Sequence, residues 1–138
     1  MLRKSRADAK LWLRQAADDY RFGRAALVGR FHAQACFVAQ QSAEKAVKAV
    51  HYHLGARPVI GHSVHALLAK LNARAGVTKD LLVTGAGLDQ LYVPTRYPDA
   101  LPGGLAPVDA FSAAQARVAL RDAGRILRWA RTQLRRTT

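Results

Sequence analysis

The stretch FVAQQSAEKAVKAVHYHLG, residues 37–55, decides the fold because its apolar residues recur with the period of an α-helix. Helical spacing relates Ala33, Cys36, Phe37, Gln40, Glu44, Val47, Val50 and Leu54. Gly55 is suited to a C-cap, and Pro58 lies just beyond it. We therefore predict a long helix over about 31–54.

Two polar residues, Gln40 and Glu44, lie in this apolar stripe, and Glu44 is the only glutamate of the chain. A carboxylate on an apolar face is costly unless it finds a cation. We therefore predict that Glu44 forms an ion pair with Arg96 or with a nearby lysine. The alternative is an exposed polar face. The neighbouring line of the helix carries Gln41, Lys45, Lys48 and Tyr52 at i, i+4, i+7 and i+11.

Outside this stretch, the apolar spacing again favours helices, since β-branched residues are sparse and no polar–apolar alternation persists. The predicted helices run over 8–28, from a Ser63 N-cap to Gly76, from Thr78 or Lys79 to Pro94, and from Pro107 or Asp109 to Arg135. Gly85 and Gly87 each weaken the fourth helix by about 1 kcal/mol relative to alanine, so either something packs closely there or the helix is loose. The prediction is one all-α domain over 6–135, an up-and-down bundle of about five helices.

The charge is strongly unbalanced, with 22 Lys and Arg against 9 Asp and Glu, a net charge of +13. Such a balance favours a polyanionic partner such as RNA, DNA, a nucleotide or an acidic protein. Part of this charge lies along the last helix, as Arg117, Arg121, Arg125 and Arg128. That stripe is suited to phosphates, with a solvated face as its alternative.

Cysteine usage and apolar run lengths bear on the compartment. The single cysteine, Cys36, excludes an intramolecular disulfide. No apolar run follows the basic start of the chain as in a signal peptide, and no stretch is long enough to span a bilayer. We expect a soluble cytoplasmic protein.

Metal and cofactor chemistry is poorly supported. His62 and His65 stand at i, i+3, but no cysteine or nearby carboxylate completes a ligand set. No nucleophile–base pairing follows from spacing either. We therefore predict no metal site and no cofactor, and we expect His62 to cap or pack at the start of the third helix.

The stretch YVPTRYPDALPGG, residues 92–104, carries more chemistry than a connector needs. Tyr97 precedes a proline and is pushed towards extended geometry, which stiffens the segment around Arg96. Such a segment holds a guanidinium in place for Asp99, for Glu44 or for a phosphate. We predict a binding site around Arg96, with Lys45 and Lys48 as its opposite wall and with Tyr92 or Tyr97 stacking on a base.

Three motifs together, ACFVAQQSAEKAVKA (35–49), GHSVHALL (61–68) and YVPTRYPDA (92–100), resemble the HEPN domain family, the nucleotide-binding domain of higher eukaryotes and prokaryotes. The match runs along nearly the whole chain. The resemblance implies an all-α bundle that commonly dimerises, and pairing with a minimal nucleotidyltransferase, sometimes as toxin and antitoxin. The positions that match the recurrent polar residues are Gln41, Lys45, Arg96, Tyr97 and Asp99.

Many HEPN proteins are metal-independent ribonucleases with an arginine, a polar residue and a histidine a few positions on. Here no histidine follows Arg96, so that motif is not intact and the chain looks like an RYPD-type branch. Three functions follow from the sequence. The first is a homodimeric module that binds a nucleotide or RNA phosphate near Arg96. The second is a ribonuclease toxin in which His62 replaces the missing histidine, and the third is a partner subunit of a nucleotidyltransferase.

Overall fold

The computed structural model describes residues 2–71 and 75–136, which form six α-helices and no strand. The helices are α1 (Leu2–Val28), α2 (His32–His53), α3 (Val64–Ala69), α4 (Lys79–Asp89), α5 (Pro107–Ala110) and α6 (Ala113–Arg135). Two 3₁₀ turns, η2 (Pro98–Ala100) and η3 (Pro102–Gly104), lie between α4 and α5. The predicted all-α bundle is confirmed. None of the described helices has both the length and the hydropathy that a bilayer span needs.

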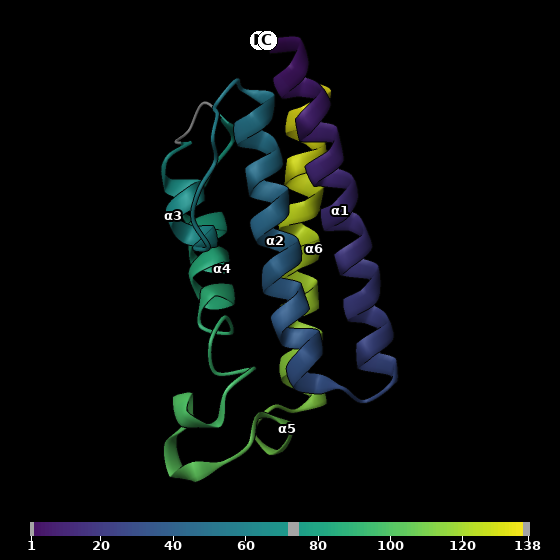
Figure 1. The fold of residues 1–138 in the computed structure, drawn as a ribbon, viewed down its shortest axis with the longest axis vertical. Helices are drawn as coiled ribbons and strands as arrows, with labels where there is room; N and C mark the ends of the chain where they lie inside the picture. The colour runs from purple at the N-terminus through teal and green to yellow at the C-terminus, as the bar shows by residue number, and fades with distance from the viewer. Residues whose placement is uncertain (1, 72–74, 137–138) are drawn as a thin grey trace.

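The three long helices α1, α2 and α6 pack side by side as the main body of the molecule (Figure 1). The shorter helices α3 and α4 pack on each other and along α2 and α6. The segment with η2, η3 and α5 closes the opposite end of the bundle from the one where α1 begins and α6 ends. The chain therefore places residues 92–104 at one end of α2.

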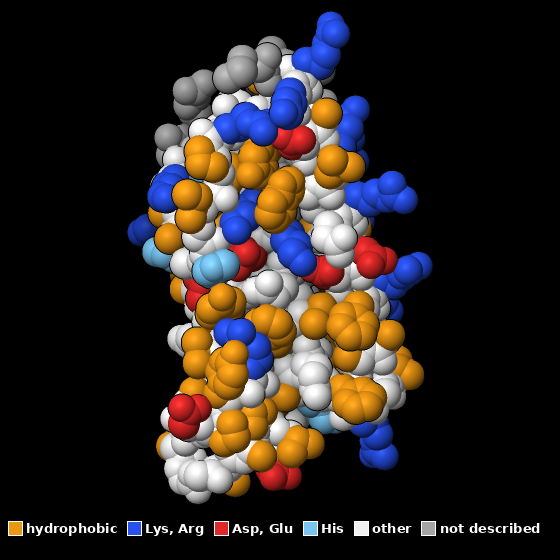
Figure 2. All heavy atoms as spheres, in the orientation of Figure 1, with side chains coloured by type: hydrophobic (Ala, Val, Ile, Leu, Met, Phe, Trp, Pro, Cys, Tyr) orange, Lys and Arg blue, Asp and Glu red, His pale blue; other side chains and the backbone are white. Residues whose placement is uncertain are grey.

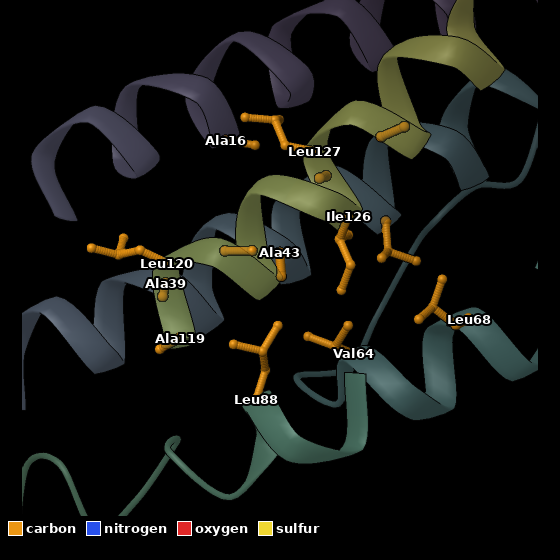
Figure 3. Packing of buried hydrophobic residues seen from close by; sticks show 14 of the residues in the cluster. Ala16, Ala39, Ala43, Val64, Leu68, Leu88, Ala119, Leu120, Ile126 and Leu127 are labelled. Carbon is orange, nitrogen blue, oxygen red and sulfur yellow. The ribbon is translucent and has the colours of Figure 1, made fainter. Parts of the chain in front are cut away.

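Both α2 and α6 place many alanines in the core, and α6 adds Leu120, Ile126 and Leu127. Ala39 and Ala43 of α2 are fully buried and let the neighbouring helices approach closely. Figure 3 shows the side chains of Ile126, Val64 and Leu88 pointing towards one another between α6, α3 and α4. This shared cluster attaches α3 and α4 to the long helices.

The helix ends that depend on local capping agree with the sequence. Gly55 follows α2 with φ 94°, and its N–H and that of Ala56 donate to the carbonyls of Tyr52 and His51, at 2.9 and 3.0 Å. This is the bond pattern of a Schellman cap. The hydroxyl of Ser63 accepts from the Ala66 N–H at the start of α3, and Thr78 does the same for α4. The predicted starts of α3 and α4 and the end of α2 are confirmed.

Four predicted boundaries are wrong. Helix α4 ends at Asp89 and not at Pro94, and residues 90–96 form turns. Helix α1 begins at Leu2 and not at Asp8, since Ser5 and Ala9 are buried in the bundle and hold its first turns. Helix α3 ends at Ala69 and not at Gly76, with a tighter bond from the Leu71 N–H to the Leu68 carbonyl. The last helix is interrupted. Pro107 starts only the short α5, and α6 starts after a capping box in which Ser112 and Gln115 exchange hydrogen bonds.

The two glycines of α4, Gly85 and Gly87, have different environments, so we predict that alanine substitutions at the two positions change the stability in opposite directions. A Cβ on Gly85 would lie 3.1 Å from side-chain carbons of Leu68 and Val64 and 3.2 Å from the His65 backbone nitrogen, whereas one on Gly87 meets nothing within 4 Å. We expect Gly87→Ala to stabilise the protein by up to about 1 kcal/mol through helix propensity. Gly85→Ala should cost about 1 kcal/mol net, because overpacking outweighs that gain. Urea unfolding midpoints measure both, and equal upward shifts would contradict the close packing at Gly85.

Candidate functional site

Gln40 of α2 is fully buried and bridges three parts of the chain. Its side-chain nitrogen donates to the His62 carbonyl at 2.8 Å and to Asp89 Oδ1 at 3.3 Å, and its oxygen accepts from Gln41 at 2.8 Å. A buried amide is costly unless its donors and acceptor find partners. Gln40 therefore fixes the segment before α3 and the end of α4 against α2.

Asp89, the last residue of α4, caps the start of α3. Its carboxylate accepts from the Ser63 hydroxyl at 2.7 Å, the Val64 N–H at 2.8 Å and the His65 N–H at 3.0 Å. Asp89 was not among the residues predicted from the sequence. A signal was present, because a carboxylate in the last turn of its own helix opposes the helix dipole and points to another partner.

Glu44 lies in a buried ion pair with a lysine of its own helix. The side chains of Glu44 and Lys48 are 5% and 8% exposed, and their charged atoms are 3.2 Å apart. The other oxygen of Glu44 lies 3.4 Å from His62 Nδ1 and 3.5 Å from the Gln41 amide nitrogen. Of the two partners that the sequence suggested, the structure places the nearby lysine there, and Arg96 lies elsewhere. We call Gln40, Gln41, Glu44, Lys48, His62 and Asp89 the polar network.

The guanidinium of Arg96 lies among three aromatic rings. Its central carbon is 4.5 Å from the ring centres of Phe37 and Tyr92 and 5.0 Å from that of Tyr97. Its Nε donates to the Tyr92 carbonyl at 2.8 Å. We call Phe37, Tyr92, Arg96 and Tyr97 the Arg96 cage. Within the described residues no acceptor contacts the two terminal amino groups of Arg96, and neither Asp99 nor Glu44 pairs with it.

Tyr92 joins the Arg96 cage to the polar network. The rings of Tyr92 and His62 are stacked, with centres 5.4 Å apart and planes at 16°. His62, Ser63, Asp89 and Tyr92 line a hollow of about 220 Å³. The side chain of His62 is 65% exposed, and its Nδ1 faces Glu44. His62 and Arg96 thus contact the same aromatic ring.

The remaining predicted site residues lie around these two clusters. Lys45 pairs with Asp19 of α1 at 2.5 Å, and Tyr97 is half exposed at the rim of the cage. Asp99 is exposed in η2. Figure 2 shows hydrophobic side chains around Lys and Arg side chains on this face, with carboxylates and a histidine near mid-height. The structure therefore brings Gln41, Glu44 and Lys48 together on α2. It gathers Tyr92, Arg96 and Tyr97 beside Phe37 of the same helix, and it pairs Lys45 with Asp19 instead.

The arginine stripe of the last helix lies on α6, away from both clusters. All four arginines, Arg117, Arg121, Arg125 and Arg128, are exposed. Arg125 donates to the Thr84 hydroxyl at 3.2 Å, and Arg121 lies 3.4 Å from Asp122. Between the described residues, no hydrogen bond or ion pair links the stripe to the Arg96 cage.

Other titratable groups belong to the core. Burial raises the pKa of the Cys36 thiol to about 11, which leaves it protonated and unreactive at neutral pH. Burial lowers the pKa of His51, whose Nε2 bonds the Leu67 carbonyl at 2.8 Å. No group of three metal-ligating side chains occurs in the described ranges.

Several solved structures share this arrangement of helices. TT1696 from Thermus thermophilus is 38% identical with a TM-score of 0.86, over 91% of this chain and 97% of that one. An archaeal HEPN homologue, ST0689, is 34% identical with a TM-score of 0.77, over 91% and 97%. The HEPN domain protein TM0613 from Thermotoga maritima is 32% identical with a TM-score of 0.73, over 91% and 98%. No curated protein matches the chain.

The sequence itself matches a family model as well. The model describes the HEPN domain and covers residues 9–133, which include all of the helices that form the two clusters. The resemblance of the three motifs is thereby confirmed at the level of the family, and the structural relatives agree with it over nearly their full length. This chain belongs to the HEPN domain family.

Proposed function

We propose that this protein binds a nucleotide or an RNA phosphate at the terminal amino groups of Arg96. The proposal depends on one observation, which is that the Arg96 guanidinium is held in place while its terminal amino groups have no partner among the described residues. Its Nε bond to Tyr92 and its three ring contacts hold it in place, while its outer edge has no acceptor among the described residues. A fixed planar fork binds a phosphate oxygen pair without first losing side-chain freedom.

The surrounding residues have separate parts in this proposal. The half-exposed ring of Tyr97 stacks on a base, because the ring of Tyr92 already contacts both His62 and Arg96. The ammonium of Lys45 pairs with Asp19 of α1. The ammonium of Lys48 is neutralised by Glu44, so it serves the fold more than the ligand.

The direct test is mass spectrometry of the purified protein for co-purifying nucleotides or RNA fragments. A titration of a fluorescent nucleotide follows, first with the wild type and then with Arg96→Ala. Absence of binding to nucleotide and to single-stranded RNA by the wild type would refute the proposal.

A second candidate function, a metal-independent ribonuclease, is favoured by the Glu44–His62 contact of 3.4 Å. A carboxylate at Nδ1 leaves Nε2 of an exposed imidazole available as general acid or base beside Arg96. Labelled RNA incubated in EDTA distinguishes the two functions. Shortening by the wild type and not by His62→Gln selects the nuclease, and intact RNA selects the binding module.

The motif resemblance also supports a proposal about partners. We place the chain in the RYPD-type branch, as a homodimer and as the partner of a minimal nucleotidyltransferase in a toxin–antitoxin-like pair. Sedimentation tests whether the chain is a homodimer. Co-purification of this chain and the nucleotidyltransferase from one expression strain tests whether the two form a complex. Separate elution of the two chains would contradict that pairing.

The arginine stripe of α6 predicts a salt dependence. If Arg117, Arg121, Arg125 and Arg128 contact phosphates, replacing all four by Gln should flatten the slope of log K against log salt for single-stranded RNA by up to about 3. A control removes four exposed cations elsewhere, Arg3, Lys4, Arg24 and Arg30. Equal slopes in the two variants would indicate that the arginine stripe does not contact phosphates and is a solvated face.

A further inference from the structure

A second aromatic cluster lies on the same face of the molecule, outside the Arg96 cage. The rings of Trp12 from α1 and Tyr52 from α2 are stacked, with centres 5.7 Å apart and planes at 19°. Lys48 Nζ is 5.5 Å from the Trp12 ring centre, and the Arg57 guanidinium is 5.9 Å from that of Tyr52. We call Trp12, Tyr52, Lys48 and Arg57 the Trp12 platform.

The Trp12 ring borders open space. A hollow of about 260 Å³ lies beside it, lined by Leu11, Trp12, Gln15 and Lys45. The indole is only partly buried, and it lines this hollow. An aromatic wall with an amide and an ammonium at its side suits a flat heterocycle that carries hydrogen-bonding groups.

Helix α2 sets the distance between the two clusters. Phe37 of the Arg96 cage and Tyr52 of the Trp12 platform are fifteen residues apart on α2, which is about 22 Å at 1.5 Å per residue. Lys45 and Lys48 lie on the helix line between them. A stacked single strand advances about 3.4 Å per nucleotide, so about seven nucleotides cover the distance and a free nucleotide does not.

The charges at the Trp12 platform determine whether a ligand would be held there by phosphate attraction or by stacking. Two carboxylates neutralise its cations, since Asp8 pairs with Arg57 and Glu44 with Lys48. The nearby Lys45 is likewise paired, with Asp19. Phosphate attraction is therefore weak here, in contrast to Arg96. Stacking on the indole is left as the main attraction, and stacking tolerates any base and depends little on salt.

We propose that the Trp12 platform is a nucleobase subsite, and that the ligand of this protein is a single-stranded RNA of about seven or more nucleotides. The proposal rests on the proposed function, since phosphate recognition at Arg96 fixes the other end of the strand. It commits to RNA because the net charge of +13 favours a polyanion and the stacked rings of the platform suit unpaired bases.

The chain has a second tryptophan, Trp129 on α6, which permits a direct optical test. Trp129 donates to the Ala75 carbonyl at 2.7 Å and belongs to neither cluster. In a Trp129→Phe protein, Trp12 is the only tryptophan. Titration with octaadenylate should quench its fluorescence with the same midpoint as binding followed by anisotropy, whereas AMP should leave it unchanged.

Affinities of Trp12 variants give an independent readout. Trp12→Leu keeps an apolar side chain without a π-face and should weaken octaadenylate binding about tenfold, by the same factor at low and high salt. AMP affinity should not change. Trp12→Phe should restore most of the loss, which a merely structural role of the indole would not predict, and thermal melts confirm that each variant is folded.

The outcomes separate this inference from the proposed function. If octaadenylate binding depends on Arg96 but neither quenches Trp12 nor weakens in Trp12→Leu, the platform is not a subsite and the proposed function stands. If Trp12 is quenched while Arg96→Ala binds as the wild type does, the Arg96 proposal fails and the platform stands.

Discussion

Glu44→Ala is expected to lower the free energy of unfolding by about 3–5 kcal/mol, the cost of breaking a buried ion pair from one side. The variant leaves the ammonium of Lys48, whose side chain is 8% exposed, without its carboxylate. It also removes an acceptor from Gln41 and the neighbour of His62 Nδ1. Because small domains are stable by only about 5–15 kcal/mol, urea unfolding should begin at much lower concentrations than in the wild type.

A surface pair of the same chemistry is the matched control. Asp18 and Arg21 of α1 lie 3.1 Å apart with side chains 60% and 86% exposed, so Asp18→Ala should cost no more than about 1 kcal/mol. Double substitution of Glu44 and Lys48 by Gln and Met should recover part of the loss, because no unpaired charge is then buried. An unchanged midpoint for Glu44→Ala would show that the pair contributes nothing.

Arg96→Ala is expected to weaken nucleotide or RNA binding by roughly a hundredfold or more, since each charge-assisted hydrogen bond contributes about 1.5–3 kcal/mol. Arg96→Lys should restore little. An ammonium neither forms a bidentate fork nor spreads its charge over Phe37, Tyr92 and Tyr97. The helical circular-dichroism signal should persist in both variants, because Arg96 lies outside every helix.

The control for the charge lost is Arg24→Ala, an exposed arginine on α1. Titration of a fluorescent nucleotide against all three variants measures affinity, and sedimentation measures association. The binding role would be refuted if the wild type bound no ligand and Arg96→Ala unfolded the protein or dissociated an oligomer. Residues 96–99 (RYPD) would then have a structural role and no role in ligand binding.

The fold was predictable where it depends on local signals. The apolar period of α2, the hydroxyl caps at Ser63 and Thr78 and the glycine after α2 act within a few residues, so the sequence contains them. The start of α6 was also readable, since SAAQ at 112–115 has the capping-box spacing, but Pro107 drew the prediction upstream.

The site was predictable only in part. The position of Glu44 in an apolar stripe indicates that it needs a cation, but not which one. The three aromatic partners of Arg96 come from α2 and from the segment after α4. Their meeting depends on how helices pack, and spacing along the chain does not encode it. Asp89 joins α4 to α3 for the same reason.

The order of the helices has a consequence for synthesis on the ribosome. Helix α2 is made early, but the core partners Leu120, Ile126 and Leu127 belong to α6, which is made last. Until α6 emerges, α2 lacks one of the two long helices that pack on it, and the nascent chain exposes apolar surface. Completion of the core, and with it a firm support for α3, α4 and the Arg96 cage, waits for the final helix to leave the exit tunnel.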